Sequence, residues 1–258
     1  MLTATYWLVH LALKWAIASH NASFQHNVMS CVFGPKILRS VFDSNKKNGG
    51  SKAAHELAQD VISFTVSIVL FVGYAVGAFM LSTTLESRTH GTSLLSYWAI
   101  QMHTGYTLYE LILYTLFGKD AIMKLHHLLV LSENLGIICT GKLHFYCCWI
   151  GTVEGTNPCL SAVFVPKRLG QDPPMVAGAM LVLGFLFLRV LSLPFVFYQS
   201  VLDYKEVTLD SSVSTVQYML GQFAIFAVWA LSVYWFYRMV VGIMKILQKK
   251  DSKKEKSV

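Results

Sequence analysis

Two adjacent histidines, His126 and His127, lie in a stretch whose other residues are apolar enough for a membrane interior. Ionisable groups are costly in hydrocarbon, where they usually face a bundle interior or a wet cavity. Two neighbouring apolar stretches carry the carboxylates Glu110 and Glu154. An imidazole beside a carboxylate is suited to proton transfer, and the same groups can hold a polar headgroup by hydrogen bonds. These four side chains are therefore the candidate catalytic residues.

The stretch 94–117 carries its polar residues on one helical face. Four polar residues follow one another at steps of four, three and four residues: His103, Thr107, Glu110 and Tyr114. Tyr106 lies beside them. Residues at this spacing stack along one side of a helix. A polar stripe on an otherwise apolar membrane helix must face inward.

The stretch 123–141 repeats this arrangement with the histidine pair. His126 and Glu133 share one face, while His127 and Asn134 lie one flank over. Adjacent residues on a helix point about 100° apart. We therefore expect one imidazole to address a ligand and the other to pack or relay.

A third polar stripe lies on the stretch 145–165, where Glu154 and Asn157 align. Pro158 has no N–H, so it should interrupt the helix and free a backbone carbonyl that neighbours or water must satisfy. Arg189, in the next span, is the expected counter-charge for Glu154 or Glu133, because an unpaired charge at that depth is expensive.

These stripes share one depth. At about 1.5 Å per residue, Glu110 lies roughly 10 Å from the cytoplasmic end of its span, His126 about 5 Å and Asn157 about 12 Å. Each residue alone is better explained by hydrogen bonds between helices. Together, several ionisable stripes at one depth favour a functional cavity. The five cysteines lack the spacing of a zinc site, and we expect no metal.

Composition defines the class of protein. Hydrophobic residues make up 54% of the 258 residues, charged residues 14%, and the mean hydropathy is +0.50. A soluble domain has about a quarter charged residues. The sequence therefore predicts an all-α polytopic membrane protein with a peripheral N-terminal helix and a six-helix body, about seven spans in all. The predicted spans lie near 1–18, 60–82, 94–117, 123–141, 145–165, 175–201 and 216–245.

Loop charges predict the orientation. Lysine and arginine concentrate in the connections 19–58, 118–124 and 166–174, whereas 83–93 and 203–215 are poor in basic residues. Basic loops stay in the cytoplasm. We expect the C-terminus to be cytoplasmic.

The chain divides into three predicted parts. Residues 1–58 hold the N-terminal membrane helix and its basic connection, 59–245 form the membrane domain, and 246–258 form a basic tail. In the tail, Lys254 and Lys256 fit the K-x-K-x-x pattern by which coat proteins return cargo to the endoplasmic reticulum. A basic end that meets anionic lipid is the alternative interpretation. The tail and the loops account for the net charge of +7, so nucleic-acid binding is not expected.

The same residues resemble a known family. The segments are Gly105-Tyr106-Thr107-Leu108-Tyr109-Glu110, Lys119-Asp120, Leu125-His126-His127 and Glu154-Gly155-Thr156-Asn157-Pro158. They resemble the TLC domain of the TRAM, LAG1 and CLN8 proteins over about 60–245. The resemblance implies a six-helix barrel around a lipid-accessible cavity in the endoplasmic reticulum or Golgi membrane. The residues expected to contact lipid there are His103, Tyr106, Asp120, Glu133, Asn134, Asn157 and Arg189.

The resemblance leaves two functions open. Ceramide synthases, the enzymatic branch, join fatty acyl-CoA to a sphingoid base and carry a His-Asp-x-x-Asp segment after the histidine pair. This chain has Val153-Glu154-Gly155-Thr156-Asn157 instead, with an amide in place of the second carboxylate. The first hypothesis is therefore a lipid-binding protein of the endoplasmic reticulum, rather than of the Golgi or plasma membrane, that regulates membrane lipid composition or trafficking. The alternative is an N-acyltransferase with acyl-CoA as co-substrate and no tightly bound cofactor.

Overall fold

The computed structural model describes residues 51–116, 121–168, 172–209 and 215–255. Within these ranges the chain is helical and contains no strand, as the sequence predicts. The predicted first span, Asp120, Lys256 and the side chain of Lys254 lie outside the described parts.

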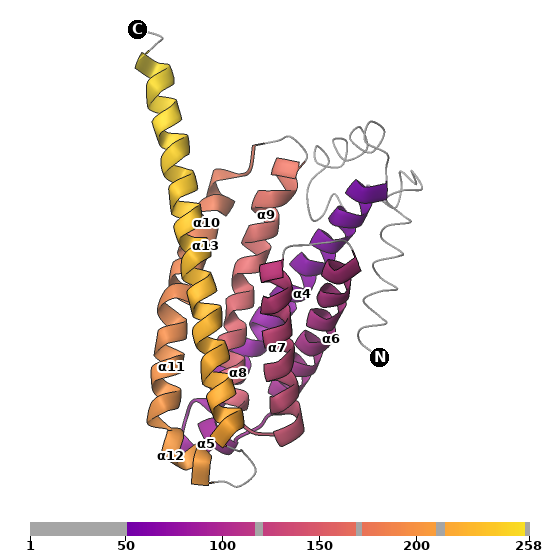
Figure 1. The fold of residues 1–258 in the computed structure, drawn as a ribbon, viewed down its shortest axis with the longest axis vertical. Helices are drawn as coiled ribbons and strands as arrows, with labels where there is room; N and C mark the ends of the chain where they lie inside the picture. Colours follow the sequence, from indigo (N-terminus) through magenta and orange to yellow (C-terminus); the bar gives the residue numbers. More distant parts are fainter. Residues whose placement is uncertain (1–50, 117–120, 169–171, 210–214, 256–258) are drawn as a thin grey trace.

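Six long rods stand side by side and form the body (Figure 1). Four of them are single helices: α4 (Ser51–Leu81), α6 (Leu94–Leu116), α7 (Ala121–Thr140) and, at the C-terminal end, α13 (Thr215–Glu255). The other two are composite: α8 (His144–Gly151), η1 (Thr152–Thr156) and α9 (Asn157–Arg168), then α10 (Met175–Gly184), the π-helical η2 (Phe185–Leu191) and α11 (Ser192–Leu202). The rods match the six predicted spans between 60 and 245.

Four stretches of the described helices are long and apolar enough to cross a membrane. They are Gln59–Leu81, Ala121–Thr140, Met175–Leu202 and Tyr218–Met244. Large apolar side chains such as Phe79, which is 80% exposed, point outward from the bundle. Such a surface suits lipid and not water. The chain is therefore a polytopic membrane protein.

Pro158 causes the break in the first composite rod. Because the backbone tightens to a 3₁₀ turn before the proline, the Asn157 N–H bonds the Glu154 carbonyl. The Val153 carbonyl is then left over, and it accepts from the Thr156 hydroxyl at 2.9 Å and from the Arg189 guanidinium at 3.1 Å. The freed carbonyl predicted from the sequence is thus satisfied by two side chains.

A second proline shapes the other composite rod in the same way. Pro194, in α11, has no N–H to offer the Val190 carbonyl four residues earlier. That carbonyl instead accepts from the indole N–H of Trp229, in α13, at 3.2 Å. This hydrogen bond therefore joins the rod of α10, η2 and α11 to α13.

Helix α4 packs closely on the broken rod because two glycines face it. At Gly151, an added Cβ would lie 2.3 Å from the ring of Tyr74, and at Gly155 it would lie 2.6 Å from the ring of Phe71. The Tyr74 ring is fully buried in the main apolar cluster. Glycine is required at these positions for close approach rather than for an unusual backbone angle.

The two short helices α5 (Leu85–His90) and α12 (Tyr204–Leu209) meet at one end of the bundle, away from the C-terminus (Figure 1). There the Arg88 guanidinium donates to both oxygens of Asp203, at 2.9 and 3.2 Å. The Tyr146 hydroxyl and the Gln199 amide donate to the same carboxylate. This network ties α5 and α8 to the end of α11.

Candidate functional site

A cavity that is partly open to the surroundings lies among the rods. Every rod contributes to its wall. One lining residue from each is Tyr74 of α4, His103 of α6, Asn134 of α7, Tyr146 of α8, Ser200 of α11 and Gly221 of α13. A chamber built from all six rods is the interior that the polar stripes predict.

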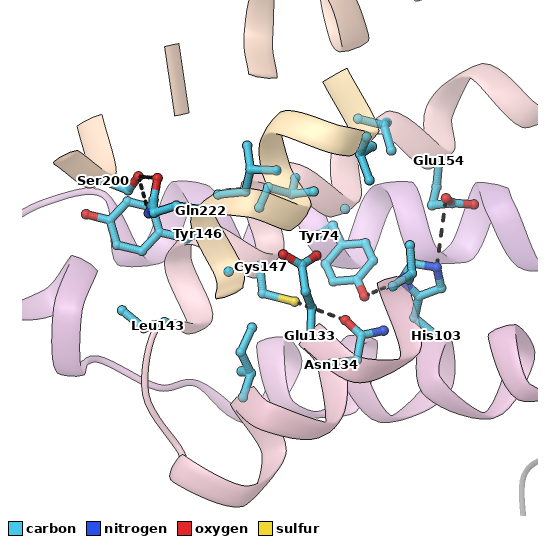
Figure 2. Close-up of a pocket in the computed structure, with 18 of the residues that line it drawn as sticks. Tyr74, His103, Glu133, Asn134, Leu143, Tyr146, Cys147, Glu154, Ser200 and Gln222 are labelled. Atoms are coloured by element: carbon cyan, nitrogen blue, oxygen red, sulfur yellow. Dashed lines mark hydrogen bonds and ion pairs between the residues drawn. The ribbon is translucent and has the colours of Figure 1, made fainter. Parts of the chain in front are cut away.

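One end of the cavity carries a chain of three polar groups (Figure 2). The Tyr74 hydroxyl lies 2.8 Å from Nδ1 of His103, and Nε2 of the same ring lies 3.8 Å from Oε1 of Glu154. All three side chains line the cavity. The hydroxyl is hydrogen-bonded to the imidazole and orients it, while the carboxylate lies beyond hydrogen-bond distance on the other side of the ring.

The histidine pair divides between two environments. His126 lines the cavity, where its ring meets Trp235 edge-on at 5.9 Å. His127 lies behind it, with Nε2 3.4 Å from Oε2 of Glu110 but without hydrogen-bond geometry. Glu110 also accepts a 2.7 Å hydrogen bond from the Tyr106 hydroxyl. His127 and Glu110 are absent from the described lining, so of the four candidate catalytic residues only His126 and Glu154 line the cavity.

Arg189 does not pair directly with a carboxylate. Its guanidinium donates to Thr156 Oγ1 at 2.9 Å and to Asn157 Oδ1 at 3.4 Å, besides the Val153 carbonyl. Asn157 in turn donates to Oε2 of Glu154 at 2.7 Å. The expected ion pair with Glu154 or Glu133 is therefore wrong for the described residues, because the carbonyl and hydroxyl of the broken helix occupy the arginine first. Asn157 connects Arg189 to Glu154 instead.

Helix α7 supplies a different wall, whose polar groups are incompletely bonded. Glu133 lines the cavity and forms no ion pair or hydrogen bond with any described residue. Asn134 is buried and accepts from the Cys147 thiol at 3.4 Å, but its Nδ2 has no partner. Nδ1 of His126 is also buried without a partner.

The opposite end of the cavity is polar as well, but its groups satisfy one another. Ser200 and Gln222 are hydrogen-bonded at 2.8 Å, and the Tyr218 hydroxyl donates to the Ser200 carbonyl at 2.9 Å. Apart from Glu133, Asn134 and Cys147, the rest of the lining is mostly apolar, with Ile137 and Ile225 among its side chains.

Of the eleven catalytic and lipid-contacting residues predicted from the sequence, all but Asp120 lie in the described parts of the chain, and of these ten, five line the cavity and five do not. His103, His126, Glu133, Asn134 and Glu154 form the first group, and Tyr106, Glu110, His127, Asn157 and Arg189 form the second. Sequence reasoning missed Tyr74, Tyr146, Cys147 and Gln222. Tyr74 lies seven residues after the equally buried Ser67, which places both on one helical face, and that spacing was the available signal.

Among the described residues, no three histidine, cysteine, aspartate or glutamate side chains are grouped so that they could hold a metal ion.

Comparison with known proteins gives one match. The family model of the TLC domain, TRAM_LAG1_CLN8, matches residues 51–241, which is well over half of the chain. No curated protein and no solved structure matches the chain.

Proposed function

The chain belongs to the TLC domain family, and we propose that it binds a membrane lipid in the cavity between its six rods. The observation that carries this proposal is the wall itself. A largely apolar lining also carries a few polar side chains, among them His103, His126, Glu133 and Glu154. Ligand sites commonly combine a mostly apolar wall with a few convergent polar groups. The apolar lining would hold a chain, and polar groups would hold a headgroup.

The consequence for the cell is control of membrane lipid composition or trafficking in the endoplasmic reticulum. The retrieval pattern at Lys254 and Lys256 supports this location. A protein that holds one lipid class inside its fold changes how much of that lipid is free in the bilayer, because bound and free lipid are in equilibrium.

Acyl transfer is the second candidate, and the Tyr74–His103–Glu154 chain is the observation that favours it. In that reaction the amine of a lipid attacks the thioester carbonyl of acyl-CoA, so the N–C bond forms and the C–S bond breaks. A cavity imidazole takes the proton from the amine and returns it to the leaving thiolate. The Tyr74 hydroxyl would keep His103 oriented during both transfers.

A cavity-filling substitution tests lipid binding. At Gly221, which lines the cavity, an added Cβ meets no atom within 4 Å. Gly221→Phe should therefore occupy the cavity without disturbing the helix. Gly242→Phe, in the same helix and with equally open surroundings, is the matched control. Mass spectrometry of lipids that copurify with the detergent-solubilised protein should show one lipid class that the wild type and the control retain and that Gly221→Phe loses. Equal lipid content in all three proteins would refute binding in the cavity.

Turnover distinguishes the two candidates. Purified protein with labelled acyl-CoA and a long-chain amine should release free CoA if the chain is an acyltransferase, and His103→Gln should abolish that release. Lipid retention without CoA release leaves binding as the function.

A further inference from the structure

The polar groups of the cavity differ sharply between its two walls. On the side of α4, α6 and η1, the polar side chains contact one another through Tyr74, His103 and Glu154. On the side of α7, Glu133 forms no hydrogen bond or ion pair with a described residue, and the buried Nδ2 of Asn134 and Nδ1 of His126 have no partner. Polar groups buried in proteins nearly always find a partner. The α7 wall therefore lacks the group that would complete it.

The missing group must supply both a donor and an acceptor. The oxygens of the Glu133 carboxyl group accept hydrogen bonds, and the Nδ2 of Asn134 can only donate them. The Oδ1 of Asn134 already accepts from Cys147, so the amide is oriented with its nitrogen free. Figure 2 shows Glu133, Asn134 and Cys147 together between the His103 end and the Ser200–Gln222 end of the cavity.

The charges of the lining exclude an anionic group at this place. Glu133 and Glu154 both line the cavity, whereas no lysine or arginine does so in the described chain. The Arg189 guanidinium is buried and donates to Thr156, Val153 and Asn157. A phosphate or carboxylate headgroup at Glu133 would bring a negative charge against a carboxyl group with no lysine or arginine in the described lining to offset it, which is unfavourable at low dielectric.

We propose that Glu133 and Asn134 form a headgroup subsite for a lipid whose polar group is a hydroxyl or an amine and carries no negative charge. The hydroxyl or ammonium donates to Glu133, and its oxygen or a neighbouring one accepts from Nδ2 of Asn134. The chain of the lipid then runs along the apolar wall past Ile137 and Ile225. This inference rests on the proposed lipid-binding function and names the class of lipid.

Three probes of equal chain length separate the headgroup chemistries. Native mass spectrometry of the full-length, delipidated protein in detergent measures the fraction that carries one molecule of hexadecylamine, 1-hexadecanol or palmitate. The amine and the alcohol should bind at least about tenfold more tightly than palmitate, since one charge-assisted or unmet hydrogen bond has about this effect. Palmitate binding within threefold of the amine would overturn the subsite.

Two substitutions then locate the subsite. Glu133→Gln keeps the shape but removes the charge, so it should weaken the amine about tenfold and the alcohol less than threefold. Asn134→Leu should weaken both. Ser132→Ala is the matched control, because Ser132 is exposed on the same helix and bonds only the Leu129 carbonyl. Retained alcohol binding shows that Glu133→Gln is folded, and uniform loss of all three probes in that variant would overturn the assigned role of its charge.

Gly221→Phe separates failure of the subsite from failure of the cavity. If this variant loses the probes while Glu133→Gln and Asn134→Leu bind like the wild type, the subsite is refuted and cavity binding stands. If Gly221→Phe binds all probes like the wild type, the alkyl chains bind only the outer surface, and both proposals fall.

Discussion

Gly151→Ala tests the packing that orients the cavity end. The new methyl group would lie 2.3 to 2.5 Å from three ring carbons of Tyr74. Carbon atoms in contact are about 3.5 Å apart or more, so the ring must move by about 1.2 Å. The hydrogen bond from the Tyr74 hydroxyl to His103 is 2.8 Å long, and such a shift breaks it. The substitution thus disturbs both the core and the site.

The magnitude follows from two terms. Overpacking costs about 1–3 kcal/mol, and leaving the buried tyrosine hydroxyl unsatisfied costs about 1–3 kcal/mol more. The better helix propensity of alanine returns about 0.5–1 kcal/mol, so the net loss is about 1–5 kcal/mol. For a chain of this size that lowers the melting temperature by about 2–20 °C.

The assay is thermal unfolding of the detergent-solubilised protein, followed by tryptophan fluorescence. Gly178→Ala is the control, because an added Cβ there meets no atom within 4 Å, and its melting temperature should stay equal or rise. In the background of Tyr74→Val, Gly151→Ala should cost much less, since the colliding ring is gone. A melting temperature within about 2 °C of the wild type for Gly151→Ala alone would refute the reasoning.

Three further outcomes are expected. Burial alone would raise the pKa of Asp203, but hydrogen bonds, led by that from Arg88, outweigh burial and hold this pKa below its usual range. The ionised carboxylate therefore stabilises the fold above the unfolded pKa of about 4 and loses that effect as the pH falls below it. Melting curves from pH 7 to pH 3 should show a steeper loss for the wild type than for Asp203→Asn, and parallel curves would contradict this. Trp229→Phe removes the indole N–H that donates to the Val190 carbonyl, so it should lower the melting temperature by about 2–8 °C. An unchanged melting temperature would contradict this hydrogen bond. Replacing Lys254 and Lys256 with serine should move the protein outward from the endoplasmic reticulum in fluorescence microscopy, whereas unchanged location would leave the tail as a basic, lipid-facing end.

The rods could be predicted from sequence because their signals are local. Runs of about 20 apolar residues define spans whatever the tertiary arrangement. Helical spacing also placed His103 and Glu110 on one stripe, and the structure buries both. The helix break could be predicted from Pro158, because the missing N–H is a property of that residue alone.

The division between cavity wall and second layer could not be predicted, because it depends on how far each helix is rotated in the bundle. A stripe spans a broad arc, so Glu110 and His103 share a face while only His103 reaches the cavity. The hydrogen-bond partners of Arg189 could not be predicted from the sequence either. Its choice depends on where the 3₁₀ turn puts the Val153 carbonyl and the Thr156 hydroxyl, which is a tertiary result.

The most direct measurement of lipid binding is covalent mapping of a photoreactive lipid in the membrane. A clickable long-chain alcohol with a diazirine in its chain is added to membranes that contain the full-length protein, irradiated, and located by peptide mass spectrometry. Lipid binding in the cavity predicts adducts on the inward-facing residues Val130, Ile137 and Ile225. These adducts should be lost in Gly221→Phe, while labelling of outward-facing Phe79 is the same in both proteins. Adducts confined to outward-facing residues, or inward adducts that persist when the cavity is filled, would contradict it.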